Sequence, residues 1–157
     1  MTNSYSASGS WTPDVTKKLV ADGRTLKDKE FNFVIKDQAG STVMTGTNDK
    51  NGKVTFVTAD GKNSNSISYT EPGNFIYTIE EVKPATEEKG MSYSDVKYTV
   101  TVRVTDPKKD GKLAVASVYV SDKESGDKTS ATFVNTIYRR RYLETDRFQR
   151  TDRWCFL

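Results

Sequence analysis

Apolar and polar residues alternate along most of the chain between residues 15 and 138. A period of two places alternate side chains on one face of an extended chain, so the pattern predicts β-strands rather than helices. Clusters of Gly, Asn, Asp and Pro separate most of the runs, as in residues 48–52 and 106–111, and they favour turns. The predicted strands cover about residues 14–20, 30–36, 42–47, 53–58, 66–70, 74–82, 95–105, 113–121 and 131–137.

Many short strands joined by regular turns are typical of an all-β, antiparallel β-sandwich, here with about 8–9 strands. Residues 59–66 and 83–92 lack the alternation, and we expect them to be loops or to contain a helical turn. The alternation also assigns faces to side chains. The predicted inward-facing residues are Phe31, Phe33, Ile35, Phe75, Tyr77, Ile79, Tyr98, Val100, Val102 and Val104, and the predicted outward-facing ones are Asn32, Lys36, Thr99, Thr101 and Arg103.

Three polar residues extend apolar strand faces by one step. Lys17 shares a face with Leu19, and Glu81 continues the face that carries Ile79. Asn135 alternates with its neighbours so that it shares a face with the apolar residues two positions before and after it. An amine, a carboxylic acid and a carboxamide are therefore predicted to point into one hydrophobic core.

A one-residue change of register leaves a second interpretation open. Lys18 adjoins Lys17 and Glu80 adjoins Glu81, so a slip of one residue would exchange the faces and put the whole polar set in solvent. Single charged residues on strands are usually solvated, which is the ordinary explanation for such positions.

If the three residues are buried together, their chemistry leads to a covalent bond. Burial disfavours charge, so it favours a free, nucleophilic amine on Lys17 and a protonated acid at Glu81. We expect Glu81 to hydrogen-bond the Asn135 carbonyl, to polarise its carbon, and to act as proton shuttle to the departing ammonia. The predicted product is an autocatalytic isopeptide cross-link between Lys17 and Asn135, with no metal and no cofactor.

Composition and charge divide the chain of 157 residues. Residues 1–138 hold 18 basic and 18 acidic groups, whereas residues 139–157 hold six Arg, three acids and no Lys. We therefore expect an N-terminal extension at 1–12, one β-sandwich domain at 13–138, and an Arg-rich tail at 139–157 that is a linker or an artificial extension. The balanced charge of the domain argues against nucleic-acid binding, which needs a cationic surface.

Other classes of protein are disfavoured by missing residue types. The chain has no His, which lowers the expectation of a Ser/His hydrolase or a zinc enzyme, and no pair of acids stands out as a glycosidase site. Cys155 is the single cysteine, so no disulfide can form within the chain. No run of apolar residues is long enough to cross a membrane, and we expect no membrane insertion by this fragment.

Six short motifs occur in a fixed order between residues 13 and 138. They are residues 17–19 (KKL), 22–26 (DGRTL), 30–33 (EFNF), 73–82 (GNFIYTIEEV), 98–102 (YTVTV) and 133–136 (FVNT). This order resembles the pilin isopeptide-linked domain family, the FctA-type, CnaB-like immunoglobulin fold of Gram-positive major pilins and surface-protein stalks. The resemblance implies an immunoglobulin-like, CnaB-type sandwich in which a lysine of the first strand is joined to an asparagine of the last.

Carried over to this sequence, the resemblance implies a cross-link between Lys17 and Asn135 with Glu81 as the catalyst. Phe33, Tyr77 and Phe133 are then expected to wall the apolar pocket, although simple core packing would also explain each of them. The elements around Arg24 look like a structural turn of the family and carry no expected chemistry.

The function implied by the resemblance is a structural module of a Gram-positive pilus shaft or of a cell-wall-anchored surface-protein stalk. The module is not expected to be an enzyme with an external substrate. Its expected partners are neighbouring domains or pilin subunits, and its expected location is extracellular, on the cell surface or in a pilus, with the signal and anchor outside this fragment. The alternative is a ligand-binding adhesin domain for a host surface ligand, with residues 59–66 or 83–92 as recognition loops.

Overall fold

The computed structural model describes residues 9–21 and 23–137, and all regular structure in these ranges is β-strand. No helix there is long and apolar enough to cross a membrane. The strands are β1 (Gly9–Trp11), β2 (Val15–Ala21), β3 (Asn32–Asp37), β4 (Thr42–Asn48), β5 (Lys53–Thr58), β6 (Ile67–Tyr69), β7 (Gly73–Val82), β8 (Met91–Ser92), β9 (Lys97–Thr105), β10 (Ala114–Ser121) and β11 (Ala131–Ile137).

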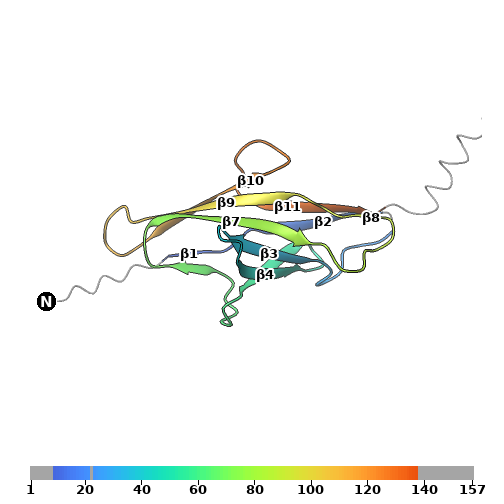
Figure 1. Ribbon diagram of the computed structural model, residues 1–157, viewed down its shortest axis with the longest axis horizontal. Helices are drawn as coiled ribbons and strands as arrows, with labels where there is room; N and C mark the ends of the chain where they lie inside the picture. The colour runs from blue at the N-terminus through green and yellow to red at the C-terminus, as the bar shows by residue number, and fades with distance from the viewer. Residues whose placement is uncertain (1–8, 22, 138–157) are drawn as a thin grey trace, which may run out of the picture.

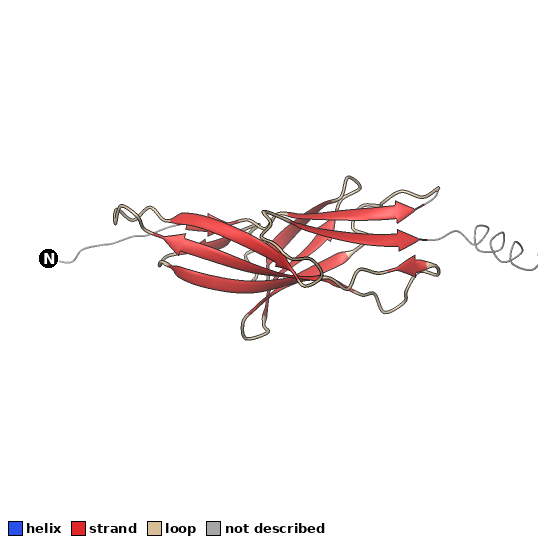
Figure 2. Cartoon of the chain, turned by 90° about the horizontal axis from the view of Figure 1, so that it is seen from above, coloured by secondary structure: helices blue, strands red, loops and turns tan. Residues whose placement is uncertain are grey.

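Nine of these strands form one continuous sheet in the order β10-β9-β7-β3-β4-β5-β2-β11-β8, and β1 and β6 form a separate pair. The large sheet curls, so that β2 and β11 lie across from β7 and β9 (Figures 1 and 2). Phe133 of β11 packs against Tyr98 of β9 with 5.4 Å between ring centroids, which closes the core between the two layers. The predicted all-β, sandwich-like fold is confirmed.

The pairing of β2 with β11 differs from the predicted antiparallel arrangement. These two strands run parallel, whereas every other strand pair of the described sheets is antiparallel. Their register sets Lys17 opposite Phe133 and Leu19 opposite Asn135. Alternation reports which face a side chain occupies but not the direction of its partner strand, so the sequence pattern could not reveal the parallel pair.

The inward faces agree with the predicted alternation. Phe33, Ile35, Ile79, Val100 and Val102 have no exposed surface at all. All the predicted inward residues are buried except Phe75, which is partly buried. Buried apolar side chains from both layers thus form one core, and removing such side chains from water is the main favourable contribution to folding.

Two short strands were not predicted. β1 pairs with β6 and places Trp11 on Tyr77, with ring centroids 5.2 Å apart and nearly parallel rings. β8 lies within the segment 83–92, which was expected to be a loop or a helical turn, and it pairs with the end of β11. The expectation of a loop at 59–66 is confirmed.

The predicted limits of the domain remain predictions. The expected extension at 1–12 overlaps β1, whose pairing with β6 ties residues 9–11 to the rest of the fold. The Arg-rich tail at 139–157 lies outside the described residues.

Candidate functional site

One carboxylate bridges two strands that are far apart in the sequence. The Lys17 amine on β2 donates a hydrogen bond to Oε1 of Glu81 on β7, with an Nζ–Oε1 distance of 2.5 Å. The Asn135 side chain on β11 donates from Nδ2 to Oε2 of the same carboxylate, at 2.8 Å. The three residues that the sequence pattern singled out therefore meet through the two oxygens of Glu81.

All three side chains are removed from solvent. Asn135 has no exposed surface, Lys17 is 2% exposed and Glu81 is 8% exposed. Lys18 is exposed, and Glu80 is more accessible than its neighbour Glu81. The strands thus have the register that the alternation predicts, and the one-residue slip does not occur.

The parallel register explains how Lys17 reaches the neighbourhood of Asn135. Lys17 faces Phe133 on β11, so Asn135 is its diagonal neighbour two residues further along the same inward face. Diagonal neighbours of a sheet lie about 7–8 Å apart, a gap that a lysine side chain can span. Glu81 enters from the opposite layer, where it pairs in register with Phe33 of β3.

The environment of Lys17 lowers the pKa of its amine. Burial lowers the pKa of Lys17, while the hydrogen bond and the charge of Glu81, and the charge of Glu30, act in the opposite direction. Desolvation is the largest of these effects, so the pKa lies below the ordinary value for lysine. The Lys17 Nζ also lies 4.4 Å from the centre of the Phe31 ring. A lowered pKa increases the fraction of amine that is free to act as a nucleophile.

The orientation of the Asn135 amide corrects one expectation. Its Oδ1 accepts a hydrogen bond from the backbone N–H of Ser94 at 2.8 Å. An N–H donor requires an oxygen opposite it, so this contact fixes the amide and directs Nδ2 at Glu81. Glu81 was expected to hydrogen-bond the carbonyl of Asn135, but it bonds the nitrogen instead.

The apolar wall is formed by a different set of aromatic residues from the one expected. Phe33 and Phe133 are fully buried and pack together with ring centroids 5.3 Å apart. Tyr77 is not part of this wall, since it lies four residues before Glu81 along β7, about 13 Å away at the usual rise of a strand. It stacks on Trp11 and shares a hydrogen bond with the Tyr69 hydroxyl. The ring of Phe31, which was not among the expected wall residues, lies beside the Lys17 amine.

Residues 83–96 supply two contacts to Asn135 that the alternation of polar and apolar residues did not predict. The Ser94 backbone N–H meets Oδ1 of Asn135, and the Met91 sulfur lies 3.7 Å from its Nδ2. Met91 belongs to β8, whose pairing with β11 places the segment beside Asn135. A main-chain N–H is present in almost every residue, so residue type carried no signal for Ser94.

A half-buried ionic cluster ties the same segment to the turn that follows β2. The Arg24 guanidinium forms ion pairs with Glu30 and with Glu88, the latter at 2.7 Å. The backbone N–H of Glu88 donates to the Tyr93 hydroxyl at 2.8 Å, which links the cluster to the residue before Ser94. These contacts connect the elements around Arg24 to the segment that carries Ser94.

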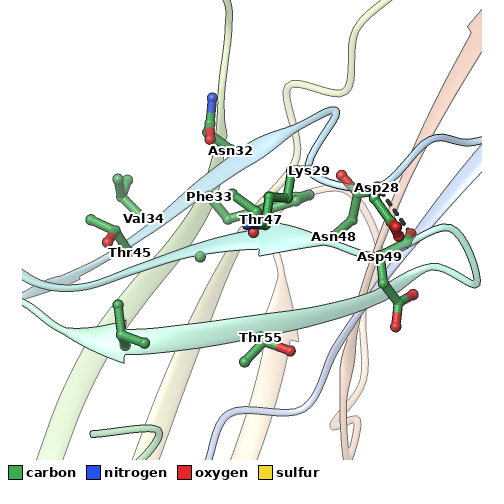
Figure 3. Close-up of a pocket in the computed structure, with 12 residues that line it drawn as sticks. Asp28, Lys29, Asn32, Phe33, Val34, Thr45, Thr47, Asn48, Asp49 and Thr55 are labelled. Atoms are coloured by element: carbon green, nitrogen blue, oxygen red, sulfur yellow. Dashed lines mark hydrogen bonds between the residues drawn. The ribbon is translucent and has the colours of Figure 1, made fainter. Parts of the chain in front are cut away.

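An open groove on the surface lies apart from the buried carboxylate. Residues 9–21 and 23–137 contain no group of His, Cys, Asp and Glu arranged to hold a metal ion. An open groove runs over the outer side of β3, β4 and β5 and is lined by side chains that include Asn32, Val34, Thr45 and Thr55 (Figure 3). It contains none of the three bridged residues.

Comparisons with known proteins identify the family and the fold of the chain. The family model described as "FctA: Spy0128-like isopeptide containing domain" matches residues 13–138. Curated protein sequences include no significant match to the chain. Two solved structures of the major pilin from Streptococcus pyogenes, an asparagine-to-alanine mutant and a glutamate-to-alanine mutant, are similar in fold, each with a TM-score of 0.51.

The sequence identity to those two pilin structures is 20% and 22%, so the likeness concerns the fold alone. In both cases the match covers 84% of this chain and 51% of the pilin chain. The chain therefore spans about half the length of the pilins it matches.

Proposed function

The chain belongs to the Spy0128-like isopeptide-containing domain family, and we propose that it is a structural module of a Gram-positive pilus shaft or cell-wall-anchored stalk, locked by an isopeptide bond between Lys17 and Asn135. The observation that carries the proposal is the single buried carboxylate of Glu81, which contacts the Lys17 amine and the Asn135 amide nitrogen. A buried amine, acid and carboxamide in contact hold all the atoms that the reaction needs.

The proposed reaction exchanges one amide for another. The lone pair of Lys17 Nζ attacks Cγ of Asn135, and a proton leaves the amine through Glu81. The same carboxyl group delivers a proton to Nδ2, the bond from Cγ to Nδ2 breaks, and ammonia leaves. The product is a neutral amide between two side chains, so no buried charge remains on Lys17 and no oxidant or reductant is required.

The roles of the three residues follow from their contacts. Lys17 is the nucleophile because its amine has a lowered pKa and lies in an apolar site. Asn135 is the electrophile, and Glu81 is the proton shuttle because it contacts both nitrogens between which protons must move. The reaction consumes its own asparagine, so it occurs once in each chain and acts on no external substrate.

A covalent bond between the first and last long strands suits a load-bearing module. The proposed bond closes a loop of 135 − 17 = 118 residue steps. By analogy with disulfides, closing a loop of this size lowers the conformational entropy of the unfolded chain. This effect stabilises the fold by about 4–5 kcal/mol. The proposed partners are neighbouring domains or pilin subunits, and the proposed location is the cell surface or a pilus.

Intact mass under denaturing conditions tests the bond. The purified, folded chain is expected to be lighter than its sequence by one ammonia, and Glu81→Ala is expected to restore the full mass because the proton shuttle is gone. Glu80→Ala is the matched control, since Glu80 is adjacent on the strand but makes no contact with Lys17 or Asn135, and it is expected to keep the mass loss. Finding the unmodified mass in folded wild type would exclude the cross-link.

A further inference from the structure

We propose that the backbone N–H of Ser94 is a catalytic group of the isopeptide reaction, because it holds the negative charge that develops on Oδ1 of Asn135. This inference rests on the proposed function, and it assigns a separate group to each end of the reacting amide. Glu81 serves the two nitrogens, and Ser94 serves the oxygen.

The two hydrogen bonds of Asn135 divide these tasks. The Ser94 N–H lies 2.8 Å from Oδ1, whereas Glu81 Oε2 lies 2.8 Å from Nδ2. Both oxygens of Glu81 are already engaged by nitrogen donors, Oε1 by the Lys17 amine and Oε2 by Asn135 Nδ2. The oxygen of the tetrahedral adduct therefore needs a donor other than Glu81, and the Ser94 N–H already occupies that position.

The electron count of the attack shows when this donor acts. As Lys17 Nζ forms its bond to Cγ, the π electrons of the carbonyl move onto Oδ1, which becomes an oxyanion. When the bond from Cγ to Nδ2 breaks and ammonia leaves, these electrons return and the carbonyl forms again. The hydrogen bond from a donor to Oδ1 is therefore stronger in the transition state than in the ground state. An interaction accelerates a reaction only if it meets this condition.

The donor is fixed in place before the reaction begins. β8 ends two residues before Ser94 and pairs with β11, with Ser92 opposite Thr136, the residue that follows Asn135. On the other side, the Val96 N–H donates to the Ser94 hydroxyl at 3.4 Å. β11, which carries Asn135, therefore also positions the segment that carries the Ser94 N–H. A preorganised donor needs no rearrangement at the moment of attack.

The test replaces one backbone amide by an ester. Full-length chains are made by chemical synthesis with an ordinary peptide bond or with an ester before residue 94, which removes the N–H and keeps the serine side chain. Each chain is folded by dilution from denaturant, native folding is followed by tryptophan fluorescence, to which buried Trp11 contributes, and loss of ammonia is followed by intact mass. Losing one oxyanion donor is expected to slow the reaction about 100-fold after folding is complete.

A matched ester before Lys97 is the control. The Lys97 N–H donates to the Asp122 carboxylate at 3.0 Å at an exposed position, so this ester also removes one hydrogen bond but none at the reacting amide. It is expected to react at the rate of the all-amide chain.

The outcomes separate the inference from the proposed function. If the all-amide chain folds and loses no ammonia, the isopeptide bond itself is wrong. If the all-amide chain reacts and the folded Ser94 ester reacts equally fast, the bond stands and the role of the Ser94 N–H is overturned. Equal slowing by both esters would likewise overturn it, since the effect would then be general.

Discussion

Lys17 is a charged residue type held in a place that disfavours charge. Its amine is buried and has one carboxylate partner, Glu81, beside the face of Phe31. Breaking a buried ion pair by removing one partner commonly costs about 3–5 kcal/mol, because the remaining charge is left uncompensated. In the unreacted domain, removing the carboxylate of Glu81 is therefore expected to lower the free energy of unfolding strongly.

The variant Glu81→Gln provides a pH-dependent test of this burial. Without the carboxylate, the charge of Glu81 no longer opposes the desolvation that lowers the pKa of Lys17 in the folded state. In the unfolded chain the pKa returns to about 10.4, so the unfolded state binds more protons between the two values. The free energy of unfolding is expected to rise with pH in that window, by at most about 1.4 kcal/mol per pH unit, and to level off above it.

Urea unfolding of Glu81→Gln between neutral and alkaline pH measures this slope. Adding Lys17→Met to the same background removes the titrating amine and keeps an unbranched side chain, so the rise is expected to disappear. A rise that persists without Lys17 would assign the pH dependence to another group.

Sequence alone located the three polar residues but only part of their surroundings. Lys17, Glu81 and Asn135 could be predicted because each lies in a strand whose two faces differ clearly in polarity. Tyr77 was wrongly expected at the site, because alternation gives the face of a side chain and not its distance from Glu81 along β7. Ser94 could not be found, since its contribution is a main-chain N–H that only the folded chain places at Asn135.

At the scale of elements, the turn between β4 and β5 fixes the backbone of Lys17. The Lys17 N–H donates to the Gly52 carbonyl oxygen at 2.6 Å. Gly52 has a φ of +93°, and a Cβ built on it would lie 2.3 Å from the Lys17 carbonyl oxygen. Only glycine fits this conformation and this close approach, so the turn and β2 are held together at the reactive lysine.

Replacing Gly52 by alanine is expected to disturb the reaction as well as the fold. A left-handed conformation costs a non-glycine residue about 1–2 kcal/mol. Gly52→Ala adds a steric clash to that cost, so it is expected to destabilise the domain further and to slow ammonia loss as Lys17 is displaced.

Gly40→Ala is the matched control for this change. Gly40 has a similar φ of +86° but has no atom within 4 Å of an added Cβ, so only the conformational cost applies. Thermal unfolding and intact mass measured on both variants separate the two contributions. Equal effects would show that the close contact with Lys17 is unimportant.

The long strands could be predicted from the chain, but the shortest strands and one strand direction could not. β9, with its alternation from Tyr98 to Val104, carries enough positions to define a period. β1 has three residues and pairs with β6, and β8 has two residues and pairs with β11. Strands this short are too short to show a period in the sequence. The parallel direction of β11 relative to β2 likewise depends on contacts between residues more than 100 positions apart, such as Lys17 and Phe133.

For the whole molecule, the proposed bond decides how the domain responds to force. Pulling on the chain ends of the unbonded domain would unfold the 118 residue steps between Lys17 and Asn135 and release about 400 Å of extended chain. With the bond in place, force passes from β2 to β11 through the two side chains, and this length stays folded. The wild type is therefore expected to show no such extension in single-molecule pulling, whereas Glu81→Ala shows it.

The control for pulling is Glu80→Ala, which is expected to behave like the wild type. An extension of about 400 Å in wild type that has lost ammonia would contradict the assignment of the bond to these two residues.

The parallel pairing of β2 and β11 also gives the domain a direction. Because the two strands point the same way (Figure 1), the chain enters β2 at one end of the sandwich and leaves β11 at the opposite end. An antiparallel pair would return the chain to the end where it entered, and successive copies would have to double back. Copies of this domain joined in series would instead form an extended chain of domains, in which every copy has the same orientation along the chain.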